Sequence, residues 1–289
     1  MSLCSRQDYD LVNAKKTFKA NKLSICEVES QCRSEKSTIR IDIDSFTIWF
    51  SGKIDFTRVD RGWNDSVVYS EMKKGTRYDL VRAFLEKYTK KFGVIHADTI
   101  SIIMFDQLPS RNWKIKCNSL TMYELRGGHD IAWLNQCVTR KLQSLDITRT
   151  HGPMIQIEQR ILETSRLLRL GMLSNMRDEH MTMVKAPDFI MKSDEMTERG
   201  VRKFLKHFLI NGRVEDRTEI TIPLSRSSDC TRLIPENIRF RITEPPSFSS
   251  AFFHAKLLGG FENVHGIHTP RRLSVRWREL RFRARSGSC

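Results

Sequence analysis

Short apolar segments recur along the middle of this 289-residue chain at a nearly constant spacing. The segments cover residues 99–104, 119–123, 141–147, 167–171, 187–191 and 219–222. Measured between their central residues, from Ile102 to Ile220, the steps are 20, 23, 23, 22 and 30 residues. A spacing of about 20–29 residues with one strand per unit is typical of leucine-rich repeats. The pattern predicts an α/β fold built as a leucine-rich-repeat-like ladder, with an ordinary parallel α/β domain as the alternative.

The sequence before the ladder predicts a helix followed by a small β unit. Residues 1–21 are predicted to form a short helix with one apolar face, and Lys22–Val28 a strand. Thr38–Phe50 alternates apolar and polar residues in two runs, which predicts two strands joined by a turn at Asp44-Ser45. These elements lie directly upstream of a second predicted helix.

That second helix covers Arg77–Phe92, because its apolar and aromatic residues recur at three and four positions and therefore share one face. The preceding stretch, Gly52–Gly75, is polar and predicted to be irregular. Trp63, Val67 and Val68 are its expected apolar anchors.

An amphipathic helix is predicted at Thr197–Asn211, with Thr197 as its N-terminal cap. Its core-facing residues are Val201, Phe204, Leu205, Phe208 and Leu209. Farther on, Ile238–Thr243, Leu273–Trp277 and Leu280–Ala284 alternate apolar and basic residues, which predicts a terminal β element that caps the ladder.

The formal net charge of +15 permits binding to nucleic acid, an acidic protein or anionic lipid. The segment 271–289 alone supplies +6 of this charge. The arginines that alternate with aromatic residues there are the candidates for contact with phosphate or another anion, namely Arg276, Arg278, Arg281 and Arg283. Strand alternation, with rings inward and arginines outward, explains the same pattern and is the preferred interpretation, so nucleic acid is not the expected partner.

Motifs of catalysis and metal binding are missing. No phosphate-binding GK[ST] loop, dinucleotide-binding GxGxxG or nucleophile elbow occurs in the sequence. The seven cysteines are scattered, and His265 and His268 are the only closely spaced metal-ligand pair. We therefore expect a protein that is not an enzyme and binds no cofactor or metal. The sequence also has no signal peptide or membrane-spanning run, which predicts a cytoplasmic or nuclear protein with reduced thiols.

Three blocks resemble one family. The first resembles the end of an F-box, in Ser2, Leu3, Cys4, Ser5, Leu11, Val12, Lys19, Leu23 and Ile25. The second is WKIKCNSLTMYEL and the residues up to 147, and the third is MTERGVRKFLKHFLING at 196–212. In this order they are similar to nematode, Caenorhabditis-type F-box proteins with an F-box-associated type 2 domain. The resemblance covers residues 1–258 and lacks the earlier F-box helices; Gly259-Gly260-Phe261 is kept, but the family's following Arg-x-Asp-Gly is not.

The resemblance implies a domain order of a partial F-box at 1–21, an F-box-associated domain at 22–258 and a basic C-terminal segment at 259–289. It implies docking to the Skp-family adaptor of a cullin ubiquitin ligase and capture of a target protein for ubiquitination. Leu3, Cys4, Leu11 and Val12 are the expected adaptor contacts. The strand face or the terminal loops of the ladder would hold the target. A stand-alone binding domain without adaptor docking is the alternative.

Overall fold

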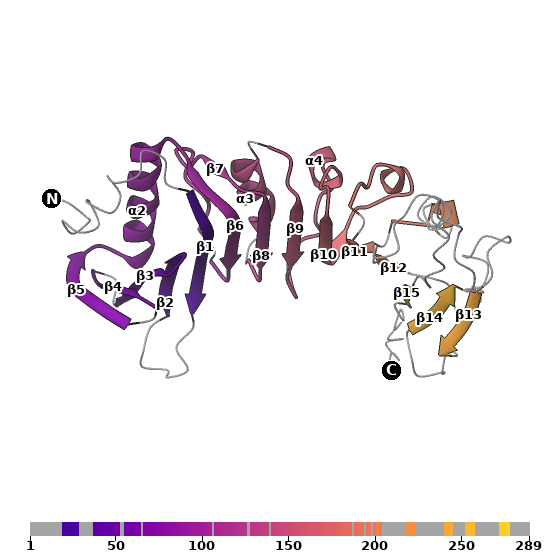
Figure 1. Ribbon diagram of the computed structural model, residues 1–289, viewed down its shortest axis with the longest axis horizontal. Helices are drawn as coiled ribbons and strands as arrows, with labels where there is room; N and C mark the ends of the chain where they lie inside the picture. Colours follow the sequence, from indigo (N-terminus) through magenta and orange to yellow (C-terminus); the bar gives the residue numbers. More distant parts are fainter. Residues whose placement is uncertain are drawn as a thin grey trace, which may run out of the picture. The chain divides into compact units, whose positions relative to one another are not determined.

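A computed structural model shows a mixed α/β protein in two compact units, Met1–Pro153 and Met154–Cys289 (Figure 1). The structure describes residues 19–28, 37–52, 55–64, 66–105, 107–125, 128–138, 140–186, 188–193, 195–197, 199–200 and 202–203, with backbone alone at 90–92, and it describes the backbone of 218–222, 240–244, 252–257 and 272–277. The predicted α/β class is confirmed. The boundary between the units falls inside the predicted domain 22–258.

The first unit is built on a sheet in which an antiparallel meander continues into parallel strands. The strands are β1 (Lys19–Val28), β2 (Thr38–Ile43), β3 (Phe46–Gly52), β4 (Phe56–Trp63), β5 (Ser66–Lys74), β6 (Ile95–Ile103), β7 (Ile115–Lys116), β8 (Ser119–Tyr123) and β9 (Ser144–Thr148). Their order is β5-β4-β3-β2-β1-β6-β8-β9, with β7 paired to β6. Strands β1 to β5 pair antiparallel, whereas β1, β6, β8 and β9 run parallel.

Helix α2 (Arg77–Phe92) covers one face of this sheet and confirms the predicted helix at both ends (Figure 1). The Thr76 hydroxyl accepts a hydrogen bond from the N–H of Asp79, and Gly93 ends the helix with φ of 73°. The buried side of α2 carries Val81 and Leu85, which belong to the apolar core.

Two predictions before the ladder are wrong. Lys19–Asn21, predicted as helix, begin β1, because Lys19 and Ala20 pair with residues of β6. The stretch Gly52–Gly75, predicted as irregular, holds β4 and β5, which pair along their whole length. Its expected anchors Trp63, Val67 and Val68 are 40%, 53% and 68% exposed, so they do not anchor the stretch in the core.

In this unit, all of the predicted apolar segments form strands. These strands pair side by side in the order in which they occur in the sequence. Ile102 pairs with Met122, and Met122 pairs with Ile147, so the steps are 20 and 25 residues. Helix α3 (Asp130–Cys137) lies between β8 and β9 in the sequence. Backbone hydrogen bonds repeat with the strands: Met104 donates to Tyr123 and Glu124 donates to Thr148.

The second unit repeats this combination of parallel and antiparallel strands. Its elements are α4 (Gln159–Leu162), β10 (Leu167–Ser174), the 3-10 turn η2 (His180–Thr182), β11 (Asp188–Ser193), β12 (Thr218–Ile222), β13 (Phe240–Glu244), β14 (Phe252–Leu257) and β15 (Arg272–Trp277). The strand order is β10-β11-β12-β15-β14-β13. Strands β10, β11, β12 and β15 run parallel, and β13 and β14 add antiparallel to β15.

The predicted segments at 167–171, 187–191 and 219–222 correspond to β10, β11 and β12. Two strands of the terminal β element, β13 and β15, are confirmed, β14 was not predicted, and 280–284 lies outside the described residues. Of the helix predicted at Thr197–Asn211, residues 199–200 and 202–203 are helical. The Thr197 hydroxyl accepts a hydrogen bond from the N–H of Gly200 at 3.3 Å, as expected of an N-terminal cap.

Candidate interaction surface

The sheet of the first unit has one face that no described helix covers. On the opposite face, Phe84, Leu85 and Tyr88 of α2 line a small cavity together with Leu23 and Ile43. Side chains alternate between the two faces along each strand, and paired residues of neighbouring strands point to the same face. The strand register therefore determines which side chains lie next to one another on the uncovered face.

Two adjacent rows of side chains form this surface, which we name the open face. The first row contains Thr47, Asp42, Ser24, Ser101, Thr121 and Asp146. The second row contains Trp49, Arg40, Cys26, Ile103, Tyr123 and Thr148. Each row crosses six strands, from β3 to β9. The chain thus presents a continuous strand surface, the kind that repeat proteins use for binding.

Two of the three charged residues of the open face, Arg40 and Asp42, form an ion pair. Arg40 lies 2.7 Å from Asp42, which also accepts a hydrogen bond from the Thr47 hydroxyl at 2.9 Å. The Arg40 guanidinium lies 5.8 Å from the centroid of the Trp49 ring. Asp146 accepts a hydrogen bond from Thr148 at 3.0 Å. The two rows therefore carry a formal net charge of −1, from Arg40 against Asp42 and Asp146.

The centre of the open face is uncharged. Cys26, Ile103 and Tyr123 lie side by side in one row, and Tyr123 is 44% exposed. Burial, reinforced by Asp42, raises the pKa of the Cys26 thiol, so the sulfur stays protonated at neutral pH and is a poor nucleophile. Small hydroxyls and a few apolar groups suit contact with another protein surface better than bond chemistry.

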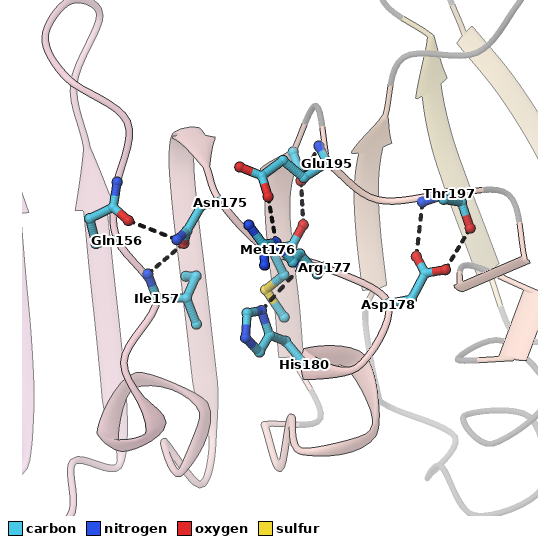
Figure 2. A network of polar contacts seen from close by, with 10 residues as sticks. Gln156, Ile157, Asn175, Met176, Arg177, Asp178, His180, Glu195 and Thr197 are labelled. Atoms are coloured by element: carbon cyan, nitrogen blue, oxygen red, sulfur yellow. Dashed lines mark hydrogen bonds and ion pairs between the residues drawn. The ribbon is translucent and has the colours of Figure 1, made fainter.

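The second unit carries a network of polar contacts where the chain leaves β10 and β11 (Figure 2). Asn175 accepts a hydrogen bond from the N–H of Ile157 at 2.7 Å and donates to the Gln156 side chain at 2.7 Å. Asp178 accepts from the N–H of Thr197 at 2.9 Å and from its hydroxyl at 2.5 Å. These polar groups form hydrogen bonds with one another. The network therefore stabilises the loops and is not a catalytic site.

Replacing Asn175 with alanine should lower the free energy of unfolding by about 1–2 kcal/mol, because the N–H of Ile157 loses its acceptor. Thermal unfolding monitored by circular dichroism would measure the change. Arg177→Ala is the matched control: Arg177 bonds Glu195 at 2.6 Å on the exposed surface, and its loss should leave the melting temperature unchanged. Equal effects of the two substitutions would contradict a structural role for Asn175.

Most of the other residues singled out from the sequence are not described by the structure. Leu3, Cys4, Leu11, Val12, Arg278, Arg281 and Arg283 lie outside the described residues. Arg276 is part of β15, where its backbone pairs with Thr221 and Phe252. No family model, curated protein or solved structure matches this chain.

The described part of the chain contains no group of three or more metal-binding side chains, and none of its helices is long and apolar enough to cross a membrane. The open face was not predicted residue by residue. Its one sequence signal is the polar residue between apolar ones in each strand, such as Ser101 between Ile100 and Ile102. Serine and threonine occur equally in loops, so this signal identifies no surface until the strands are aligned.

Proposed function

We propose that this protein is a non-enzymatic protein-interaction module that serves as the substrate-recognition subunit of a Skp-cullin-F-box ubiquitin ligase. The parallel strands would form a leucine-rich-repeat-like ladder that holds a target protein, and residues 1–21 would be the remnant of an F-box. The observation that carries the binding function is the continuous open face, with its uncharged centre at Cys26, Ile103 and Tyr123. The ligase assignment is supported by the resemblance of residues 1–25, 113–147 and 196–212 to F-box proteins.

In this proposal the protein acts by proximity and makes or breaks no bond. Adaptor docking through Leu3, Cys4, Leu11 and Val12 would tether the chain to the ligase. The open face would hold the target, so that target lysines meet the conjugating enzyme at a raised effective concentration. The uncharged centre of the face agrees with a receptor that relies on shape and apolar contact.

Adaptor binding is tested by a pull-down of the purified chain with a Skp-family adaptor at low and moderate salt. We expect retention at both, because apolar docking depends little on ionic strength. Leu11→Asp and Val12→Asp should abolish retention by placing a charge in the contact. Leu108→Asp is the control, since Leu108 is an exposed leucine outside the proposed contact. A folded wild-type chain that is not retained would refute the ligase assignment.

The second candidate function is a stand-alone protein-binding domain. It is favoured by the open face itself, whose twelve residues lie between positions 24 and 148 and include none of the proposed adaptor contacts. Target binding and adaptor docking would then be separable. Substitutions at Ile103 and Tyr123 should disturb the first, and substitutions at Leu11 and Val12 the second.

A further inference from the structure

Next to one end of the open face, a cluster of basic side chains lies where three strands begin. Lys19 of β1 pairs with His96 of β6, and His96 pairs with Lys116 of β7, so the three side chains lie in one row. Ile95 and Ala97, on either side of His96, are buried in the core, which directs His96 to the opposite face. The sheet thus places two lysines and a histidine next to one another on its uncovered side.

A chain of contacts through one carboxylate adds Arg140 to this cluster. Lys19 Nζ lies 2.8 Å from Asp98 Oδ1, and the Asn118 amide donates to the same oxygen at 3.1 Å. Arg140 in turn donates to Asn118 Oδ1 at 3.2 Å. Asp98 lies within β6 and Asn118 lies directly before β8, each one residue before the paired Thr99 and Ser119. The paired strands therefore bring together the two side chains that hold Lys19 and Arg140.

The pKa of His96 reflects the excess of positive charge around its side chain. Partial burial lowers the pKa of His96, and Lys116, Lys19 and Arg140 lower it further. Among the described residues, Asp98 is the one carboxylate that acts on His96 in the opposite direction. We name Lys19, His96, Lys116 and Arg140 the basic end of the open face.

The positive charge decreases over the next rows of the sheet. The adjoining row contains Lys22, Thr99, Ser119 and Ser144, and the Asp44 carboxylate accepts hydrogen bonds from the N–H groups of Asn21 and Lys22 at 2.9 Å each. The row after it contains Asp42 and Asp146 at its sides. A long polyphosphate would meet these carboxylates, whereas a short acidic stretch followed by uncharged residues would match the surface.

We propose that the basic end binds an acidic segment of a partner protein, and that the uncharged centre of the open face takes the adjoining apolar residues. The inference rests on the proposed protein-binding function and specifies the chemistry of the partner. It does not depend on adaptor docking. Three cations beside one carboxylate, Lys19, Lys116 and Arg140, provide charge complementarity, and the Asp98–Asn118 contacts hold two of them in place before binding.

The test is fluorescence anisotropy of the full chain with labelled polyglutamate, with uncharged polyglutamine and a single-stranded oligonucleotide in parallel. Polyglutamate should bind at low salt and polyglutamine should not. Lys116→Glu and Lys19→Gln should each weaken polyglutamate binding, the charge reversal by about tenfold. Lys74→Glu makes the same charge change as Lys116→Glu on the exposed strand β5 and should leave binding unchanged.

Equal weakening by Lys116→Glu and Lys74→Glu would overturn the inference, because it would show general attraction to a basic protein. Tighter binding of the oligonucleotide that is lost in the same variants would also overturn it, in favour of nucleic acid. Thermal unfolding of each variant verifies that it is folded. If polyglutamate fails to bind a chain that the adaptor retains, only this inference fails. If polyglutamate binds and the adaptor does not, only the ligase assignment fails.

Discussion

Replacing Asp130 with alanine is expected to lower the free energy of unfolding by about 3–5 kcal/mol, because it leaves a buried cation without its partner. Asp130 lies in the first turn of α3, and its Oδ2 is 2.9 Å from Arg149 Nη1. Both side chains are only 2% exposed. The contact has the geometry of an ion pair and not of an aligned hydrogen bond. Arg149 also donates to the carbonyl of Pro153.

Urea unfolding of Asp130→Ala, Asp130→Asn and the double variant Asp130→Leu with Arg149→Met would measure this effect. The single variants should be strongly destabilised, and the double variant should recover part of the loss, because it removes both buried charges together. A loss below about 1 kcal/mol in Asp130→Ala would mean that the pair behaves like an exposed one and would contradict the prediction.

The same pair predicts an unusual pH dependence. Burial raises the pKa of Asp130, and Arg149 opposes this shift. In Arg149→Met the positive charge beside Asp130 is removed, so the pKa of Asp130 in the folded chain rises further above its pKa in the unfolded chain. Between the two pKa values the folded chain holds a proton that the unfolded chain has released, so stability falls as pH rises. Arg149→Met should therefore lose less unfolding free energy, relative to wild type, as the pH is lowered from 7. Urea unfolding over a pH series measures this difference. A difference that grows on acidification would contradict the prediction.

Sequence patterns predicted the elements whose determinants are local. Helix α2 was predicted from the apolar residues that recur on one of its faces, and the residues that end it, Thr76 and Gly93, directly flank the same segment. The strands β6, β8, β10 and β11 were located because each contains a short apolar segment, and these segments recur at a nearly constant spacing. These signals need no knowledge of the neighbouring strands.

The β4–β5 hairpin was missed because its determinants are not local. Strand β5 has no buried face, so the alternation that marks a strand is absent, and backbone pairing with β4 holds it in place. The basic end of the open face was not predicted for a related reason. Lys19, His96 and Lys116 are far apart in the sequence, and only the strand register brings them into one row. The Asp130–Arg149 pair likewise joins the start of α3 to the residue after β9.

Replacing Trp133 with alanine is expected to lower the free energy of unfolding by about 3–5 kcal/mol, because it opens a large cavity in the core of the first unit. Trp133 is fully buried, and its ring centroid lies 5.3 Å from that of Trp113 and 6.1 Å from that of Phe105. Trp113 and Trp133 are 20 residues apart, the same step that separates β6 from β8. The rings therefore link the segment before β7 to helix α3.

Urea unfolding of Trp133→Ala, Trp113→Ala and the double variant tests this link. The loss of unfolding free energy in the double variant should be smaller than the sum of the losses in the two single variants. Both substitutions open the same space, so the second removes contacts that the first has already removed. Trp63→Ala is the control and should cost far less, since Trp63 is an exposed residue at the end of β4. Trp133→Phe should also cost less than Trp133→Ala, because the buried indole N–H has no hydrogen-bond acceptor among the described residues and the ring contacts are largely kept. Strictly additive losses would instead mean that the two tryptophans stabilise the fold independently of each other, which would contradict the link between them.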